Sequence, residues 1–324
     1  MGRDVLILSF SFEQEEEAFR VVEQGGFNPL LLAEKDRKGW TEKELAAYWN
    51  GLAQKPPGII MGADIPLGEE FVRAAQGLRA VSLNCAGSDH LDLDAFHRAG
   101  IVVCNVPRQN FDAVADFVWG QILALMRRIP LGDRTIRRGQ WCSGVERGIA
   151  VSGKTLGIIG FGAIGQAIAA RAAGFGMRLI VSSTSRKPEP AARYGAVYVE
   201  RETLFREADI IVPSCPLTPE TRHIINEETL SIMKPGAVVV NSSRGGIIHT
   251  PALMEALRRG TIAGAALDVY EEEPLLDSEL FELDNVVLTP HMAGLADREI
   301  HNVAMQAARH IVDLLSGRET NTEI

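Results

Sequence analysis

The chain has 324 residues, 46% of them hydrophobic, and a formal net charge of -9 at pH 7. This length is typical of two domains that each bury a core, and the acidic balance, with no concentrated run of Lys and Arg, argues against a nucleic-acid partner. No stretch approaches the roughly 18 uninterrupted apolar residues of a membrane span, and the first apolar run, Val5–Leu8, is too short for a signal peptide.

Short apolar runs alternate with longer helical patterns along the chain, which predicts doubly wound parallel α/β structure with helices on both faces. In chain order, strands are predicted at Val5–Ser9, Gly58–Met61, Leu78–Leu83, Ile101–Cys104, Thr155–Ile159, Arg178–Val181, Asp209–Val212, Ala237–Asn241, Ile262–Leu267 and Val286–Leu288. The predicted helices are Glu13–Gln24, Glu69–Gln76, Ala113–Arg128, Ala163–Phe175, Pro251–Arg259 and Asp297–Ser316. The last helix carries an apolar face that must pack against another element.

The four cysteines, Cys85, Cys104, Cys142 and Cys215, are widely separated along the chain. They form no CxxC pair and show no spacing that is typical of metal ligands. Buried thiols of this kind are common in proteins of a reducing compartment. We therefore predict a cytoplasmic protein without a metal site.

Gly160, Gly162 and Gly165 form a G-x-G-x-x-G pattern between a predicted strand and a predicted helix. In that position the pattern predicts a dinucleotide site, where the three glycines permit a tight turn, a close approach of the backbone to the pyrophosphate, and close packing of the helix on the strand. The amides at the start of the helix would hold the phosphates. The predicted contacts from this loop are Gly160, Phe161, Gly162, Ala163, Ile164 and Gly165.

The strand that follows the glycine motif ends in hydroxyl-bearing residues and a cation, Ser183, Thr184, Ser185 and Arg186, and no Asp or Glu occurs between Glu146 and Glu189. A carboxylate here would bind the ribose hydroxyls of NAD. Hydroxyls and an Arg instead suit the 2′-phosphate of NADP. We therefore predict NADP in preference to NAD, with the alternative that this loop is only solvated surface.

Three ionisable residues, Arg244, Glu273 and His291, each follow a predicted strand. In an open parallel sheet, ligands bind beyond the carboxyl ends of the strands, so these loops would face one crevice. Arg supplies a planar cation for a carboxylate or a carbonyl oxygen, and His is a proton donor near neutral pH. A carboxylate beside that His would orient it and favour its charged form. Each residue alone has an ordinary structural explanation, but together with the dinucleotide motif they predict hydride transfer to a 2-keto acid.

The chain resembles the D-isomer-specific 2-hydroxyacid dehydrogenases, a family that includes glyoxylate/hydroxypyruvate reductases and phosphoglycerate dehydrogenases. The resemblance covers most of the chain, in shared order and spacing. It is carried by Ala86–Asp92, Asn105-Val106-Pro107, Val114-Ala115-Asp116, Gly153–Met177, Cys215–Thr218, Lys234-Pro235-Gly236, Ser243–Gly246, Ala266–Tyr270 and Thr289-Pro290-His291.

The resemblance implies roles for these residues. His291 would be the acid/base, Glu273 its orienting carboxylate and Arg244 the substrate clamp. Backbone amides of Ala86, Gly87 and Ser88 would hold the substrate carboxylate, and Asp268 would bind the nicotinamide carboxamide. The remaining expected cofactor contacts are Cys215, Pro216, Thr221, Ser242, Ser243, Arg244, His291 and Gly294.

The resemblance also implies an organisation. A Rossmann dinucleotide-binding domain of residues 105–294 would be inserted into a flavodoxin-like substrate domain of residues 1–104 and 295–324. The arm after Ala113–Arg128 resembles a dimerisation element, which predicts a homodimer, with Trp141 reaching the partner's active site. Arg108 stands where the family usually has Gly, and would bring a cation near substrate or cofactor.

Three functions remain open on these grounds. A small-substrate reductase of the glyoxylate/hydroxypyruvate type is favoured by Ser183 and Arg186 at the cofactor strand. A D-3-phosphoglycerate dehydrogenase is the alternative within the family, although the chain leaves no room for the regulatory domain that some of them carry. The third is a nucleotide-sensing protein that resembles a transcriptional corepressor and binds partners through the same fold.

Overall fold

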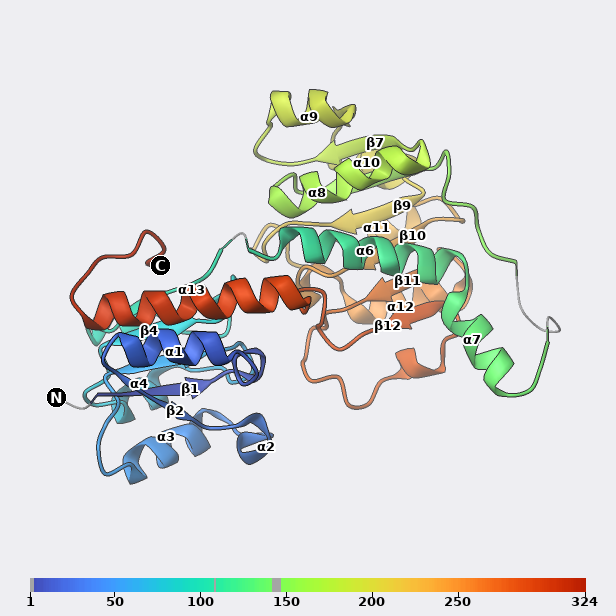
Figure 1. Cartoon of the computed structure of the whole chain (residues 1–324). Coiled ribbons are helices and arrows are strands. Elements are labelled where there is room, and N and C mark those ends of the chain that lie inside the picture. Colours follow the sequence, from blue (N-terminus) through green and yellow to red (C-terminus); the bar gives the residue numbers. More distant parts are fainter. Residues whose placement is uncertain (1–2, 108, 142–146) are drawn as a thin grey trace. The chain divides into compact units, whose positions relative to one another are not determined.

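The computed structural model of the chain describes residues 3–107, 109–141 and 147–324. The chain forms two compact units, Met1–Asn110 together with Leu295–Ile324, and Phe111–Gly294 (Figure 1). The chain enters the second unit a few residues after the predicted boundary at Cys104, and it returns between Gly294 and Leu295. Each unit contains one parallel sheet with helices on both faces, which confirms the predicted fold class.

The first unit is built on a five-stranded parallel sheet in the order β2-β1-β3-β4-β5, the order of flavodoxin-like sheets. Its strands are β1 (Asp4–Leu8), β2 (Asn28–Leu31), β3 (Gly58–Met61), β4 (Ala80–Leu83) and β5 (Val102–Cys104). One face carries α1 (Glu16–Gln24) and α13 (Asp297–Leu315). The other carries α3 (Glu42–Gly51), α4 (Glu69–Ala74) and α5 (Leu93–Arg98), and a short helix α2 (Glu34–Arg37) precedes α3.

Strand β1 is apolar on both faces because each face is covered by helices. Val5 and Ile7 lie in the core under α1 and α13, whereas Leu6 and Leu8 lie in the core on the opposite side. Helix α13 thereby buries its own apolar face, for which the sequence predicted packing against another element, on the sheet of the first unit. Its close approach depends on Gly58, where a Cβ would lie 2.9 Å from the side chain of Leu315.

The second unit is built on a seven-stranded parallel sheet in the order β12-β11-β10-β9-β6-β7-β8. The strands are β6 (Thr155–Ile159), β7 (Arg178–Ser182), β8 (Ala196–Tyr198), β9 (Ile210–Pro213), β10 (Val238–Asn241), β11 (Gly264–Leu267) and β12 (Val286–Leu288). The strand order reverses between β6 and β9, and such a reversal is where doubly wound sheets bind ligands. The glycine motif follows β6 and therefore lies at this point.

Two layers of helices cover this sheet. One face carries α6 (Phe111–Met126), α8 (Ala163–Ala172) and α9 (Pro188–Tyr194). The other carries α10 (Arg201–Glu207), α11 (Glu227–Ser231) and α12 (Thr250–Arg259), while α7 (Ile129–Arg137) extends from the end of α6 (Figure 1). No helix in the described ranges is long and apolar enough to cross a membrane.

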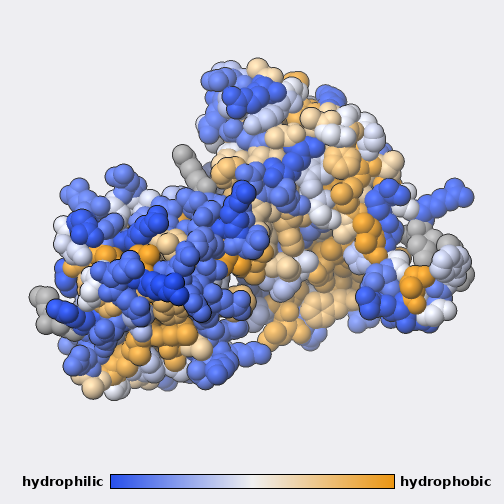
Figure 2. Space-filling view, viewed as in Figure 1, coloured by the Kyte–Doolittle hydropathy of each residue, from blue (hydrophilic) through white to orange (hydrophobic). Residues whose placement is uncertain are grey.

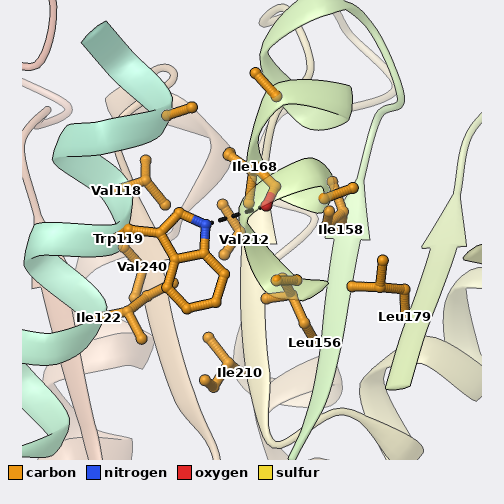
Figure 3. Close-up of a cluster of buried hydrophobic side chains, with 14 of the residues drawn as sticks. Val118, Trp119, Ile122, Leu156, Ile158, Ile168, Leu179, Ile210, Val212 and Val240 are labelled. Carbon is orange, nitrogen blue, oxygen red and sulfur yellow. Dashed lines mark hydrogen bonds between the residues drawn. The ribbon is translucent and has the colours of Figure 1, made fainter. Parts of the chain in front are cut away.

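Trp119 packs α6 against α8 and the central strands of the second unit. Its ring lies among aliphatic side chains of α6 and the central strands (Figure 3). The indole Nε1–H donates to the carbonyl oxygen of Ile168 in α8 at 3.1 Å, and the ring stacks on Phe175 with centroids 4.6 Å apart. This contact satisfies the one polar atom of a buried Trp and fixes α6 against the helix that follows the glycine loop.

The sequence missed the edge strands β2 and β8. Strand β2 contains Pro29 and has no fully buried residue, and β8 is three residues long. Their apolar runs, residues 30–32 and 196–199, are short, and at the sheet edges no residue of either strand is fully buried. The arm after Arg128, for which no secondary structure was predicted, contains helix α7 over Ile129–Arg137.

Candidate active site

The three predicted catalytic residues leave the same edge of the second sheet. Asn241, Leu267 and Leu288, the last residues of β10, β11 and β12, are neighbours in register. The loops that follow carry Arg244, Glu273 and His291 respectively. The structure therefore brings together, by strand register, three side chains that lie up to 47 residues apart in the sequence (291 − 244 = 47).

The turn that presents Arg244 is shaped by the buried side chain of Asn241. Its Oδ1 accepts hydrogen bonds from the backbone N–H of Ser243 at 3.1 Å and from its hydroxyl at 2.8 Å, and its Nδ2 donates to the carbonyl oxygen of Arg244 at 2.9 Å. Gly245 then passes directly against the backbone of Tyr270, where a Cβ would collide with the Tyr270 carbonyl group. The absence of a side chain at Gly245 thus lets the Arg244 loop approach the loop that carries Glu273.

His291 and Glu273 form an ion pair. The Nδ1 atom of His291 lies 2.7 Å from Oε2 of Glu273, and Oε1 of Glu273 accepts a hydrogen bond from the backbone N–H of Tyr270 at 2.9 Å. The two side chains are 49% and 35% exposed, so solvent and a small molecule can reach them. Because Nδ1 is held by the carboxylate, the Nε2 atom is the one that can face a substrate.

The pair shifts the pKa of both members. The hydrogen bond to Glu273 raises the pKa of His291 above its ordinary value, with burial opposing the shift and the charges of Glu273 and Asp268 adding to it. Burial alone would raise the pKa of Glu273, but the hydrogen bonds from His291 and Tyr270 and the charges of His291 and Arg244 lower it overall. The ion pair thus keeps the imidazole protonated beside an ionised carboxylate to a higher pH than an isolated histidine would allow.

Asp268 anchors the loop that carries His291. Its carboxylate is fully buried and accepts hydrogen bonds from the Thr289 hydroxyl at 2.6 Å, the Met292 amide at 3.0 Å and the Ala293 amide at 2.8 Å. The backbone of His291 has a φ of 50°, a left-handed conformation that costs free energy in a non-glycine residue. These bonds hold it there; the expected contact of Asp268 with a nicotinamide carboxamide stays a prediction.

The glycine loop has the geometry of a dinucleotide cradle. Gly160 has a φ of 92°, and a Cβ there would collide with the carbonyl oxygen of Ser214 and lie 3.0 Å from the Cβ of Cys215. Gly165 lies so close to Gly160 that its own Cβ would be 2.5 Å from the Gly160 carbonyl oxygen. At Gly162, the N-cap of α8, a Cβ would meet open space. The first and third glycines are required by the protein itself, and the middle one leaves room that a pyrophosphate fits.

The loop that would read the adenosine ribose is exposed. Arg186 pairs with Glu200 at 3.1 Å, and its guanidinium lies 5.8 Å from the centre of the Tyr198 ring. The Tyr198 hydroxyl accepts from the backbone N–H of Lys187 at 2.7 Å, and the Ser183 hydroxyl donates to the carbonyl oxygen of Ser185 at 3.2 Å. The loop is therefore ordered by its own contacts, with the cation available at its rim.

The loop after β9 contains three more of the expected cofactor contacts. The Thr221 hydroxyl donates to the carbonyl oxygen of Pro216 at 2.7 Å and accepts from the backbone N–H of Thr218 at 2.7 Å, which closes the loop on itself. Burial raises the pKa of the Cys215 thiol to about 11, so the thiol stays neutral and unreactive beside Gly160.

In the first unit, the expected carboxylate loop Ala86–Ser88 follows β4. The Cys85 thiol donates to the carbonyl oxygen of Gly87 at 3.2 Å, and the Asn105 side chain donates to the carbonyl oxygen of Ala86 at 2.8 Å. These bonds engage two carbonyl groups of the loop, and the expected binding of an anion by its amides stays a prediction. Arg108, the departure from the family pattern, lies outside the described residues, and Trp141, predicted to reach the partner's active site, is 77% exposed.

Sequence reasoning missed the residues that hold these loops in place. Asn241, Tyr270 and Gln121 each bind a loop of the site without any of the chemistry by which catalytic residues were sought. Tyr270 donates from its hydroxyl to the carbonyl oxygens of Thr289 at 2.9 Å and Leu267 at 3.1 Å. One signal was present in the sequence: Gln121 is the one polar side chain in the second half of α6, residues 117–126, and a buried amide needs partners.

Comparisons with known proteins agree with the resemblance seen in the sequence. Residues 119–293 match the family described as D-isomer specific 2-hydroxyacid dehydrogenase, NAD binding domain. A glyoxylate reductase of Thermococcus kodakarensis is 46% identical to the chain over 258 residues, which are 76% of this chain and 77% of that protein. The match therefore extends well beyond the glycine motif.

Solved structures resemble the whole chain. The TT0316 protein from Thermus thermophilus shares 33% sequence identity over 99% of each chain, with a TM-score of 0.87. A glyoxylate reductase from Paecilomyes thermophila shares 26% identity, with a TM-score of 0.86 over 100% of this chain and 98% of that one. Both units of the present chain thus have counterparts in single known proteins.

Proposed function

The chain belongs to the D-isomer specific 2-hydroxyacid dehydrogenase family, and we propose that within it this protein reduces glyoxylate, hydroxypyruvate and keto acids of similar size with NADPH. The enzyme class, an oxidoreductase that transfers a hydride between a nicotinamide dinucleotide and a 2-keto or 2-hydroxy acid, follows from the family. The choice of substrate and of NADPH, and the roles of single residues, are the proposal.

The observation that carries the proposal is the His291–Glu273 ion pair on the strand edge that also carries Arg244. A cation for the substrate carboxylate and a proton donor with a raised pKa are the two groups that keto-acid reduction requires. Their placement beyond the carboxyl ends of β10, β11 and β12, in the same sheet as the glycine loop, supports a shared crevice for cofactor and substrate.

In the proposed reaction, Arg244 binds the substrate carboxylate and draws electron density toward the carbonyl oxygen. When bound, the reduced nicotinamide supplies the hydride that adds to C2. As the carbonyl bond opens, its electron pair passes to the oxygen, which takes the proton from Nε2 of His291. Glu273 stays ionised and holds the imidazole in place, and His291 recovers its proton from solvent because the side chain is half exposed.

The rest of the site is proposed as the sequence predicts it. The cofactor would contact the Gly160–Gly165 loop, the residues 183–186, Cys215, Pro216 and Thr221, and the residues Ser242, Ser243, Asp268 and Gly294 at the catalytic edge. Backbone amides of Ala86, Gly87 and Ser88 would hold the substrate carboxylate. Support for NADPH comes from the cation of Arg186 at the rim of the β7 loop, a group that fits a 2′-phosphate.

The surface of α7 supports the proposal that two copies associate. Ile129 and Ile136 are 56% and 55% exposed and lie seven residues apart, so they share one face of this helix, and Trp141 follows it. Figure 2 shows further hydrophobic residues gathered on the second unit, over α6 and the strands beside it. Exposed apolar faces of this kind suit a protein partner. We expect a homodimer in the cytoplasm, and light scattering on purified protein measures its mass.

The test of the proposed function is steady-state reduction of glyoxylate and hydroxypyruvate, with NADPH and NADH compared side by side. Rapid turnover with a higher kcat/KM for NADPH supports the full proposal. Rapid turnover that prefers NADH keeps the substrate assignment and removes Arg186 from the cofactor site. Oxidation of 3-phosphoglycerate with NAD that is far faster than glyoxylate reduction contradicts the substrate assignment.

A further inference from the structure

A buried amide in α6 contacts two of the three loops of the catalytic edge, those that carry Arg244 and His291. Gln121 is 3% exposed and lies in the helix that packs across β10, β11 and β12. Its Oε1 accepts a hydrogen bond from the hydroxyl of Ser242 at 2.7 Å, and its Nε2 donates to the hydroxyl oxygen of Thr289 at 3.1 Å. Ser242 lies two residues before Arg244, and Thr289 lies two residues before His291.

Successive hydrogen bonds join Ser242, Gln121, Thr289 and Asp268. The direction of each bond follows from the carboxylate of Asp268 at one end of this series. The carboxylate of Asp268 accepts from two backbone amides, and the Thr289 hydroxyl donates its single proton to the same carboxylate. Thr289 then has only lone pairs left for Gln121, which must present its NH2 group there. The amide carbonyl of Gln121 consequently faces Ser242, whose hydroxyl must donate. Ser242, Gln121, Thr289 and Asp268 thus form one directed chain in which each bond polarises the next.

From this chain we infer that Gln121 is a positioning residue that sets the distance between Arg244 and His291 by tying their two loops to one point of α6. The inference rests on the proposed function for the roles of Arg244 and His291. Gln121 itself is not placed to contact a substrate or cofactor, because it is buried and both ends of its amide are hydrogen-bonded to protein side chains.

The loops that carry Arg244 and His291 need a shared contact because neither residue is part of a helix or strand. Arg244 follows β10 in a turn shaped by Asn241, and His291 is held at a left-handed φ of 50°. Strand register fixes where the loops begin but not how their ends lie relative to each other. A misplacement of about 1 Å between a substrate clamp and a proton donor can lower a rate by about 100-fold.

A purely space-filling role for Gln121 leads to different expectations. Met has nearly the same length and fits where Gln fits, so it should preserve a role in packing. Glu keeps the shape of Gln almost unchanged, but an ionised Glu cannot donate to Thr289 and would bring a second negative charge toward Asp268. A positioning role through the directed chain predicts that both substitutions disturb the site, and Glu more than Met.

The experiment compares Gln121→Met and Gln121→Glu with wild type in the full-length protein. Gln306→Met is the matched control, because Gln306 also lies on a long helix and bridges two side chains, Gln109 and His310, but in the first unit. We expect kcat/KM for the keto acid to fall by about 10- to 100-fold in Gln121→Met, further in Gln121→Glu, and by less than about twofold in Gln306→Met.

A second readout does not depend on turnover. In NMR titrations, the pKa of the His291 imidazole should fall toward its ordinary value in Gln121→Met, because a loosened loop weakens the bond to Glu273. This substitution adds no charge, and the groups that face the imidazole, namely Glu273, Asp268 and Arg244, are unchanged in it. If wild type reduces no keto acid, the proposed function fails, and this titration still decides the role of Gln121.

Ser242→Ala alone covers the case in which a Gln121 variant fails to fold, and a double-mutant cycle with Gln121→Met covers the case in which that variant changes the site by packing alone. Ser242→Ala removes one link on the Arg244 loop, yet it should shift the His291 imidazole signals in the wild-type background. In the Gln121→Met background the same change should leave those signals in place. Unchanged His291 signals in Ser242→Ala, or a Gln121→Met protein with kcat/KM within about twofold of wild type, would overturn the inference.

Discussion

The glycine loop and the catalytic edge lie in the same sheet, yet they are built in different ways. The glycine loop is one continuous stretch whose shape follows from what is missing at Gly160 and Gly165, where any side chain would collide with backbone. The catalytic edge is assembled from three separated loops, and buried polar side chains hold them together. A site made of backbone can be recognised in a short sequence motif, whereas a site made of side-chain contacts becomes visible only when the strands are in register.

The largest expected effect falls on the catalytic edge alone. His291→Ala should lower kcat by about 10²- to 10⁴-fold, the usual contribution of a positioned acid or base. The affinity for NADPH, measured by fluorescence titration, should stay within about threefold of wild type, because the glycine loop is intact. Near-wild-type turnover in this variant would show that His291 is not the proton donor.

The next prediction separates the two reasons for a glycine within the loop itself. Gly160→Ala places a Cβ against Ser214 at a φ of 92°, so the unliganded protein should lose several °C in Tm. Gly162→Ala adds a methyl group where the protein leaves open space, so its unliganded Tm should match wild type. Both variants should bind NADPH at least about 10-fold more weakly. Equal Tm values for the two variants would contradict this division of roles.

A smaller effect is expected on the pH dependence of the reaction. Reduction needs a protonated His291, and Glu273 raises the pKa of that imidazole above its ordinary 6.5. The rate should therefore persist above pH 6.5 and fall as the pH rises through the raised pKa. In Glu273→Gln the carboxylate charge is lost, and the fall should move to lower pH. Profiles of kcat/KM against pH for the two proteins make the comparison; coincident profiles would exclude Glu273 as the cause.

The same ion pair predicts a window of stability. The contribution of His291, whose folded pKa is raised, is complete below pH 6.5 and is lost as the pH rises through that folded pKa. The contribution of Glu273, whose folded pKa is lowered, is complete above pH 4.5 and is lost as the pH falls through that lowered folded pKa. The difference in Tm between wild type and Glu273→Gln should thus be largest between pH 4.5 and 6.5.

The smallest effect concerns the rim of the cofactor site. Arg186→Ala should raise the KM for NADPH by about 10-fold. This is the lower end of the range expected for loss of a charge-assisted hydrogen bond, because the Arg186 side chain is exposed. The KM for NADH should not change. Glu200→Gln, which frees Arg186 from its present ion pair, should lower the KM for NADPH by about twofold. Parallel changes with both cofactors would mean that Arg186 does not read the 2′-phosphate.

The features that the sequence predicted correctly are those with a local cause. The buried strands of both sheets are continuous apolar runs, and the turn after β6 needs glycine at Gly160 because of its own backbone conformation. Arg244, Glu273 and His291 could be proposed as catalytic residues because their chemistry and their position after strands are both visible in the sequence, and their catalytic roles stay a prediction. Their placement at one edge then followed from parallel pairing.

The remainder depends on partners that are distant in sequence. Nothing near Gln121 indicates that Ser242 and Thr289 will lie on either side of its amide. Asp268 could be assigned to a ligand from its motif, but its three donors from residues 289–293 appear only once β11 and β12 are paired. Gly245 was part of a recognised motif, yet its reason for being glycine lies in the backbone of Tyr270.

The return of α13 to the first unit has a consequence for the order in which the chain folds during synthesis. The second unit is one uninterrupted stretch, Phe111–Gly294, so it is complete once that stretch has left the ribosome. The first unit must wait, because Val5, Ile7 and Ile60 are covered by α13, and the Ser82 hydroxyl finds its acceptor in the carbonyl of Ala307. The segment that is made first is therefore finished last, and until then one face of its sheet is open to water and to chaperones.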